Sequence, residues 1–455
     1  MSDCDEAPAR LRPVLGTENS WCRAVPGGTG ITVLALLTRN QPDFSLLENS
    51  LHKLQTSHPM LKSKLQFDSL SNTFSLLIPP SPPLRLQHFD LQSTAHIAEQ
   101  DAQLTPFQNI LEHELNRNSW QDDSSDADVS HASVYALDGG KWAVVMRIHT
   151  GACDRTAAVA VLRQLLRLMS GGVAHQEEEE EEEEAKMGIE EYIPAGKTNK
   201  PFWARGVNML GYSLNSFRLT NLDFVGPSAP RSSRVVRLVV DADHTTKLLE
   251  ECRSRDIKLC GALSAAGLMA ARLCKGIPDG QWEKYAVVTL TDCRKLLEPS
   301  LSSHHVGFYH SAILNTHDLN GGEELWELAR RTYNSFRDAM NVNKHFSDMA
   351  DLNFLMCRAI ENPGLTPSSS LRTSFISVFE DPVIDETNEK YNEMGIEDYV
   401  GCASVHGVGP SIAIFDTIRD GKLDCACVYP YPLHSREQMQ ELIDNMRKIL
   451  IDCCE

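Results

Sequence analysis

Apolar residues recur along this chain in two spacings that distinguish strands from helices. A nearly continuous apolar run over residues 142–148 predicts a strand buried on both faces. After Asp154, apolar residues stand three and four positions apart up to Met169, which predicts a helix that stops at Gly171 and Gly172. This strand and its helix are the best-defined pair of elements in the sequence.

The same patterns continue on both sides of that pair. A helix opens at Pro42-Asp43 and ends at His58-Pro59, because proline disfavours helical backbone in the residue before it. The other predicted strands lie at 31–37, 61–67, 73–78, 235–240, 286–290, 374–378, 411–415 and 425–428, and the other helices at 243–253, 261–274, 323–338 and 435–451. Since strands and helices mix without strict alternation, the sequence predicts an α/β protein built of sandwich layers with mixed sheets.

A run of glutamates at 177–184 interrupts this pattern. Like charges repel and cannot bury surface, so we expect a disordered linker or surface loop over 171–200. A chain of 455 residues is also too long for a single core. The sequence therefore predicts an amino-terminal domain over 1–170 and a carboxyl-terminal domain over 201–455, joined by the acidic segment.

Composition narrows the classes of function. The formal net charge is −19, and the chain stays acidic without the glutamate run, which argues against general nucleic-acid binding. No apolar run has the length of a membrane span, and the acidic first residues do not resemble a secretory signal. Thirteen cysteines without regular spacing indicate reduced thiols in the cytoplasm, and because no second pair stands at zinc-ligand spacing, no metal is expected.

The segment that links the buried strand to its helix carries the most informative chemistry. It reads Ile-His-Thr-Gly-Ala-Cys-Asp-Arg over residues 148–155. His149 ends the strand, and Asp154 opens the helix, where its carboxylate can cap the first backbone N–H groups. A histidine that exchanges a proton near neutral pH, held beside a group that fixes local geometry, suits general-base catalysis.

Four segments, taken in this order, resemble the chloramphenicol-acetyltransferase-like acyltransferases, which include plant BAHD enzymes and the condensation domains of peptide synthetases. The first is the His-Pro-Met-Leu-Lys entry at 58–62, and the second is the 148–155 segment. The third is Thr-Asp-Cys-Arg at 291–294, similar to the family's Asp-x-Arg turn. The fourth is the closing order of strand, Asp-Gly-Lys turn at 420–422, strand and amphipathic helix. Together they span most of the chain.

The resemblance implies two domains with a central channel between them. In that channel an acyl group passes from a thioester, usually acyl-coenzyme A, to a small-molecule hydroxyl or amine. The catalytic motif residues would be His149, which accepts the proton, and Asp154, which is structural and pairs with Arg294 of the second domain. Acyl-coenzyme A would be a co-substrate, no cofactor would be permanently bound, and the chain would be a cytoplasmic monomer.

The chain departs from the family in the motif around the base. The family sequence His-x-x-x-Asp, matched without a gap on Asp154, puts Thr150 rather than His149 in the base position, and Arg155 replaces a glycine. Because consecutive strand residues point to opposite faces, His149 reaches the channel only if a bulge at Thr150-Gly151 restores its aim. Otherwise His149 is structural and Thr150 lines an altered site.

A second departure lies at the family's Asp-Phe-Gly-Trp-Gly loop. The corresponding segment, 405–409, reads Val-His-Gly-Val-Gly, so the glycines remain while the aspartate and tryptophan do not. His406 is therefore either an exposed loop histidine or a substitute base that lines the site. His304, His305 and His310 form the densest histidine cluster, but they lack carboxylate or cysteine partners at ligand spacing and are expected to lie in loops.

Three functions follow from these observations. The leading one is an acyl-coenzyme-A-dependent O- or N-acyltransferase with His149 as general base. The alternative is a catalytically inactive or weak member of the same fold that acts as a binding or scaffold protein. A third is a cysteine hydrolase that uses Cys153 with His149 or His406, which requires a thiol of lowered pKa.

Overall fold

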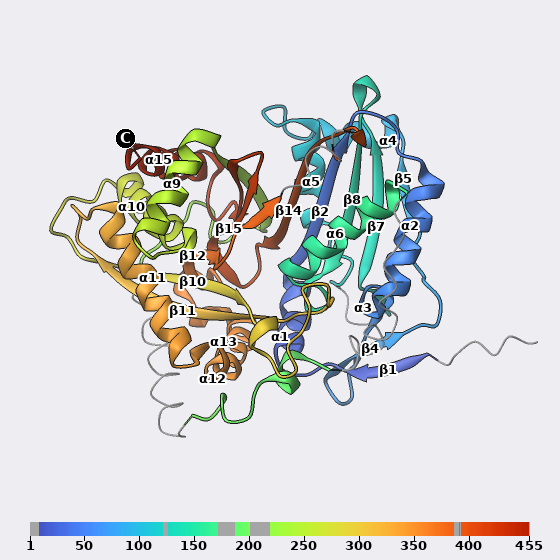
Figure 1. Cartoon of the computed structure of the whole chain (residues 1–455), viewed down its shortest axis with the longest axis horizontal. Coiled ribbons are helices and arrows are strands. Elements are labelled where there is room, and N and C mark those ends of the chain that lie inside the picture. Colours follow the sequence, from blue (N-terminus) through green and yellow to red (C-terminus); the bar gives the residue numbers. More distant parts are fainter. Residues whose placement is uncertain are drawn as a thin grey trace, which may run out of the picture.

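The computed structural model describes residues 9–121, 126–171, 187–200, 219–385, 391 and 393–454. Two lobes lie side by side, each built on its own sheet (Figure 1). The glutamate run of the predicted acidic linker lies outside the described residues. The α/β architecture with mixed sheets, predicted from the hydrophobic pattern, is confirmed.

The amino-terminal lobe is built on a five-stranded sheet of order β14-β2-β8-β7-β5. Its strands are β14 (Ile396–Val405), β2 (Thr29–Thr38), β8 (Trp142–His149), β7 (Ser130–Ala136) and β5 (Leu86–Phe89). One face packs against α2 (Phe44–Ser57) and α6 (Arg155–Met169), and the opposite face packs against α5 (Pro106–Asn116). A smaller sheet joins β1 (Arg10–Pro13), β4 (Thr73–Ile78), β3 (Lys64–Asp68) and β6 (Ala127–Asp128).

The carboxyl-terminal lobe contains a seven-stranded mixed sheet of order β11-β10-β12-β15-β16-β9, with β13 beside β15. These strands are β11 (His310–Leu319), β10 (Glu283–Asp292), β12 (Arg372–Phe379), β15 (Gly409–Arg419), β16 (Lys422–Tyr431), β9 (Ser232–Val240) and β13 (Val383–Asp385). Its core forms against α10 (Leu259–Lys275), α15 (Arg436–Asp452), α9 (Ala242–Ser254) and α11 (Leu325–Asn341). Other helices are α1 (Gly16–Ala24), α3 (Pro59–Lys62), α4 (Leu91–Ala98), α12 (Lys344–Ser347) and α13 (Met349–Glu361).

The predicted division into domains 1–170 and 201–455 is wrong for one strand. β14 belongs to the carboxyl-terminal half of the sequence but pairs with β2 and completes the amino-terminal sheet. One apolar cluster runs from Val400 and Cys402 of β14 to Ala413 of β15 and Val428 of β16. The carboxyl-terminal half therefore contributes a strand to the amino-terminal sheet, and the two lobes share a hydrophobic cluster.

Local sequence signals place the start of α2 correctly and the start of β3 incorrectly. The Asp43 side chain caps α2 by accepting from the Leu46 N–H at 3.0 Å. The strand predicted over 61–67 begins only at Lys64, because α3 occupies Pro59–Lys62. Proline is favoured at the first position of a helix, and here that preference gives one extra helical turn.

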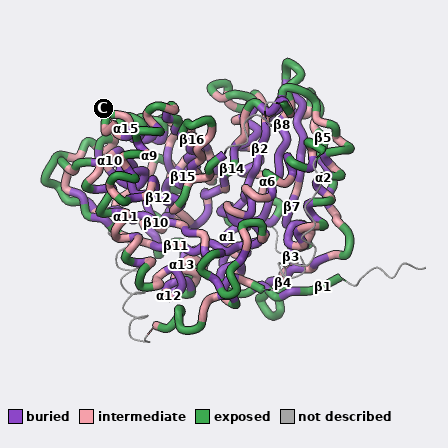
Figure 2. Tube along the Cα trace, viewed as in Figure 1, coloured by how far each residue is buried: buried purple, intermediate pink, exposed green. Residues whose placement is uncertain are grey.

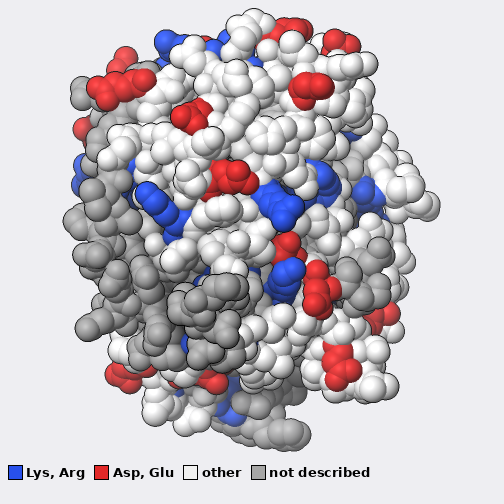
Figure 3. All heavy atoms as spheres, turned by 90° about the vertical axis from the view of Figure 1, so that its right-hand side faces the viewer, with Lys and Arg blue, Asp and Glu red and all other residues white. Residues whose placement is uncertain are grey.

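Burial and surface charge follow this architecture. Figure 2 shows buried segments concentrated along β2, β8 and the sheets of both lobes. On the face shown in Figure 3, the basic and acidic side chains that are drawn intersperse and form no single-sign stripe. Within the described ranges, no individual helix has the length and apolarity to cross a membrane; α9 and α10 pass that test only as a pair bent by 107°.

Candidate functional site between the lobes

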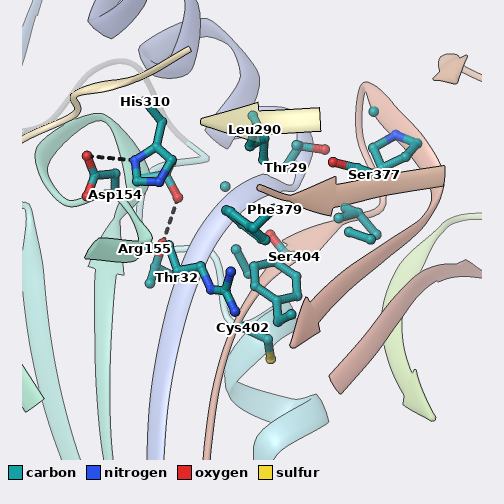
Figure 4. A pocket seen from close by; sticks show the side chains of 18 of the residues that line it. Thr29, Thr32, Asp154, Arg155, Leu290, His310, Ser377, Phe379, Cys402 and Ser404 are labelled. Carbon is teal, nitrogen blue, oxygen red and sulfur yellow. Dashed lines mark hydrogen bonds and ion pairs between the residues drawn. The ribbon is translucent and has the colours of Figure 1, made fainter. Parts of the chain in front are cut away.

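A cavity of about 400 Å³ lies between the two lobes. Strands β2, β14, β10, β11, β12 and β15, the start of α6, and α13 contribute to its walls. Most lining side chains are apolar, among them Leu34, Leu162, Leu290, Phe308, Met356 and Phe379. Figure 4 shows Thr32, Asp154, Arg155, His310 and Ser404 on the same walls.

Asp154 joins the two lobes at one end of this cavity. Its Oδ1 caps α6 by accepting from the Ala157 N–H at 2.8 Å, as the sequence predicts. Its Oδ2 accepts from the Tyr309 N–H at 2.7 Å and lies 3.0 Å from the Arg294 guanidinium. Burial alone would raise the pKa of Asp154, but the Arg294 charge and the neighbouring His310 ring outweigh it and hold the pKa well below its usual range.

Arg294 occupies the position that the resemblance implies. It is almost fully buried, and it also bonds to the Asp292 carboxylate at 3.0 Å and the His305 carbonyl at 2.9 Å. Burial opposes its charge, but Asp154 and Asp292 raise its pKa above the usual value, so the guanidinium stays charged. The carboxylate of one lobe and the guanidinium of the other thus form a buried ion pair that fixes the relative position of the lobes.

His149 does not line the cavity. The β2–β8 ladder runs without a register shift to the Ile31–His149 pair, so the bulge that would redirect His149 is absent from this pair of strands. His149 therefore shares a strand face with Val145 and Arg147, on the α5 side of the sheet. Its ring lies edge-on to Trp120, with centroids 5.4 Å apart.

The environment of His149 also disfavours proton transfer. Its Nδ1 accepts from the Gly151 N–H at 3.1 Å, and its Nε2 is buried without a partner among the described residues. Burial lowers the pKa of His149 to about 3, so the ring is neutral at physiological pH. The prediction of His149 as a channel-facing base is wrong for this structure, because strand alternation turns the ring to the opposite face.

Thr150 takes the position on the cavity wall instead. It lies in the short turn Thr150–Ala152 that follows β8, and its hydroxyl lies 2.7 Å from the Thr32 hydroxyl on β2. Two hydroxyls carry two protons, and the bond between them uses one. One O–H in this pair can therefore donate to a ligand in the cavity. The alternative in which Thr150 lines an altered site is the arrangement observed.

Arg155 extends from the start of α6 to the other lobe. Its guanidinium lies 2.9 Å from Asp416 Oδ1 on β15 and stacks over the Phe379 ring at 4.1 Å. Asp416 is fully buried, and burial raises its pKa, whereas Arg155 lowers it. The residue that replaces the family's glycine therefore forms a second charged bridge across the cavity.

His406 is neither exposed nor part of the cavity wall. It is half-buried between β14 and β15, and its Nδ1 lies 3.0 Å from the Ser233 hydroxyl. Burial, with Arg372 and Arg231 nearby, lowers the pKa of His406 to about 4. Both sequence interpretations of this residue, surface histidine and substitute base, are wrong, because the loop packs against β9.

Sequence reasoning missed His310. It was expected in a loop, yet it opens β11 and lines the cavity, with Nδ1 3.0 Å from Asp154 Oδ2 (Figure 4). The strand it begins contains the apolar Ile313 and Leu314 and pairs with β10 so that His310 is opposite Asp292. The β-prone residues after His310 could have predicted a strand here. Only the pairing with β10, however, brings the His310 ring to Asp154.

Neither Cys153 nor a metal-ligand cluster offers a further catalytic group among the described residues. Cys153 borders the cavity, but it is fully buried, and burial raises the pKa of its thiol well above the usual value, which is the reverse of what a nucleophile needs. The described residues contain no group of three histidine, cysteine or carboxylate side chains arranged for a metal ion.

Comparison with known proteins identifies solved structures that have a similar fold. No protein-family profile and no curated protein sequence matches the chain. Solved structures do. Trichothecene 15-O-acetyltransferase from Fusarium sporotrichioides has a TM-score of 0.69 at 12% identity, with 97% of this chain and 94% of that chain covered. The first condensation domain of the calcium-dependent antibiotic synthetase has a TM-score of 0.63 at 14% identity, with 99% and 97% covered.

A third structure extends the likeness to polyketide biosynthesis. The condensation domain of the monacolin K polyketide synthase has a TM-score of 0.62 at 9% identity, and 98% of each chain is covered. The TM-scores and the nearly complete coverage establish the fold. The chain therefore has the same two-lobed fold as this acetyltransferase and these condensation domains.

Proposed function

We propose that this chain binds a largely apolar small molecule in the cavity between its lobes. The size of the cavity, about 400 Å³, falls within the range of small-molecule sites. The observation that carries the proposal is the wall of this cavity, which both lobes build mostly from apolar side chains. Pockets of this kind, with a few polar groups among apolar ones, are typical of small-molecule sites.

The ligand class follows from the shape and chemistry of the wall. Apolar side chains suit an acyl chain or a hydrophobic ring system, while the Thr32–Thr150 hydroxyl pair suits a carbonyl oxygen. Acyl thioesters are the first ligands to test, because proteins of this fold include an acetyltransferase and condensation domains. Acyl-coenzyme A is accordingly the proposed ligand, and a small hydroxyl or amine compound is the proposed second ligand.

This proposal is ligand binding and does not include acyl transfer by His149, because that histidine does not reach the cavity. With Thr150 at the wall and His149 on the other face of the sheet, the cavity lacks the imidazole that the motif would supply there. The alternative of a binding protein on an acyltransferase fold therefore takes precedence. We also propose a cytoplasmic monomer; the free thiols among the described cysteines support a reducing compartment.

A cavity-filling variant tests the binding proposal. Ala312 lines the cavity from β11, so Ala312→Trp should occupy the space a ligand needs. Titration of the purified chain with decanoyl-coenzyme A, followed by calorimetry and by displacement of anilinonaphthalene sulfonate, should give saturable binding that the variant weakens at least tenfold. Ala242→Trp, at the start of α9 outside the cavity, is the matched control. Equal affinity in both variants, or no saturable binding by the unaltered chain, overturns the proposal.

A further inference from the structure

We infer that His310, paired with Asp154, is the general base of this cavity and makes it competent for acyl transfer. The inference rests on the proposed function, because the reacting ligands must occupy the same cavity. It assigns catalysis to a histidine outside the motif that the sequence brings forward, and it requires no chemistry from His149.

The position of the His310 ring is fixed from two directions. The preceding residue, Tyr309, donates its N–H to Asp154 Oδ2 at 2.7 Å, so the backbone at the start of β11 is tied to this carboxylate. The ring then brings Nδ1 to 3.0 Å from the same oxygen. On its other sides it lies edge-on to Phe379, at 6.0 Å between centroids, and near Phe308 at 6.4 Å. A base held this firmly loses little entropy when it reacts.

Asp154 determines which ring nitrogen is free. Since Arg294 keeps Asp154 ionised, the carboxylate accepts hydrogen bonds but donates none. The 3.0 Å contact with this carboxylate therefore favours a hydrogen on Nδ1 of His310, and in the neutral ring Nε2 then holds the lone pair. None of the hydrogen bonds among described residues uses Nε2, and the ring borders the cavity. Figure 4 shows Asp154 against one edge of the ring, with the cavity-lining residues beyond it.

The contrast with His149 supports the assignment. His149 uses Nδ1 as an acceptor for a backbone N–H, has an aromatic neighbour instead of a carboxylate, and does not border the cavity. His310 has the carboxylate, the outward nitrogen and the access to the cavity. Of the two histidines, only His310 meets the requirements for a general base.

The reaction balances with an acyl thioester and an alcohol or amine as co-reactants. Nε2 takes the proton from the acceptor hydroxyl or amine as its oxygen or nitrogen forms a bond to the thioester carbonyl carbon. The free O–H of the Thr32–Thr150 pair can donate to the developing oxyanion. The carbon–sulfur bond then breaks, the thiolate leaves, and the imidazolium returns the proton to it. The products are an ester or amide and a free thiol.

The test compares two chemically identical substitutions. His310→Gln removes the base but keeps an amide that can face Asp154, whereas His149→Gln makes the same change outside the cavity. Thiol release is followed with acetyl-, decanoyl- and palmitoyl-coenzyme A against a panel of alcohols and amines, and decanoyl-coenzyme A binding is measured in parallel. We expect His310→Gln to lower kcat about 10²–10⁴-fold with binding changed less than threefold. His149→Gln should keep kcat within threefold.

A second variant separates a catalytic from a structural role. His310→Gly opens space for exogenous imidazole, which should restore part of the lost turnover if the ring acts as a base and none if it only packs. Full turnover in His310→Gln overturns the inference. Binding of decanoyl-coenzyme A by the unaltered chain without thiol release for any donor and acceptor also overturns it, while the proposed binding function stands. Absence of both binding and turnover defeats both proposals.

Discussion

The Arg155 guanidinium on α6 lies 2.9 Å from the Asp416 carboxylate on β15, so the residue after the helix cap of one lobe is anchored to a strand of the other. Its neighbour Asp154 bonds to Arg294 in the same way but with the charges reversed. Two successive residues thus hold the other lobe through opposite charges. Asp154 and Arg155 both line the cavity between the lobes.

Removing the Arg155 charge should destabilise the fold, because the buried Asp416 carboxylate loses its partner. We expect Arg155→Met to lower the free energy of unfolding by about 3–5 kcal/mol at pH 7, because an unpaired buried carboxylate remains. The pKa of Asp416 is already raised by burial, so the folded state holds its proton more tightly than the unfolded state. The decrease in unfolding free energy caused by Arg155→Met should therefore become larger as the pH rises above about 4. Urea unfolding between pH 4 and pH 8 measures it.

Arg163 provides the control for that variant. It also lies on α6 and also contacts the other lobe, but it donates to the neutral Ile384 carbonyl at 2.7 Å. Arg163→Met should cost no more than about 1.5 kcal/mol at any pH in this range. Equal losses from the two arginines would contradict a charge-specific role of Arg155.

The Asp154–Arg294 pair should behave as a coupled unit. Asp154→Asn and Arg294→Met should each lower the free energy of unfolding by about 3–5 kcal/mol, because each leaves a buried charge. The double variant should lose less than the sum, with a coupling of about 0.5–3 kcal/mol. Because the pKa of Asp154 is depressed in the folded state, its contribution is present above about pH 4 and is lost below it. Additive losses at pH 7 would rule out a direct pair.

His149 should make the fold sensitive to mild acid. Its pKa is lowered to about 3 by burial, so between that value and about 6.5 the unfolded state binds the proton and the folded state does not. Stability therefore falls as the pH drops through this window, by roughly 2 kcal/mol at pH 5 from this residue alone. His149→Gln should reduce the difference in unfolding free energy between pH 7.5 and pH 5 by that amount. The exposed His304 supplies a control, since His304→Gln should leave the difference unchanged.

Cys153 should be inert towards alkylating reagents. Its thiol is fully buried and its pKa is raised well above the usual value, so almost no thiolate exists at pH 8. Iodoacetamide at pH 8, followed by peptide mass spectrometry, should modify Cys153 only after denaturation in urea. Modification of the native chain at the rate of a free thiol would reopen a hydrolase role for this cysteine.

The histidines show where a sequence can mislead about a site. The pattern around 148–155 identifies the strand, the cap and the turn correctly, and all three are observed. The sheet face to which a side chain points changes with one extra or missing strand residue. Here the regular pairing of Ile31 with His149 places the His149 ring on the face opposite the cavity. No local signal reveals that pairing, because it is set by two strands more than a hundred residues apart.

By itself the sequence determined the elements whose information is local. The strand that ends at His149 and the cap at Asp154 follow from periodicity and capping chemistry, and the mixed pattern of strands and helices predicts the α/β fold. The partnership of Asp154 with Arg294 came instead from the resemblance of the motifs to a known family. Only the tertiary structure decided that β14 joins the amino-terminal sheet, that His149 lies on the α5 side, and that His310 reaches Asp154 from a distant hairpin. Those outcomes depend on pairing and packing between remote segments. A hydrophobic pattern shows which face of a strand or helix is buried, but not which distant segment packs against it.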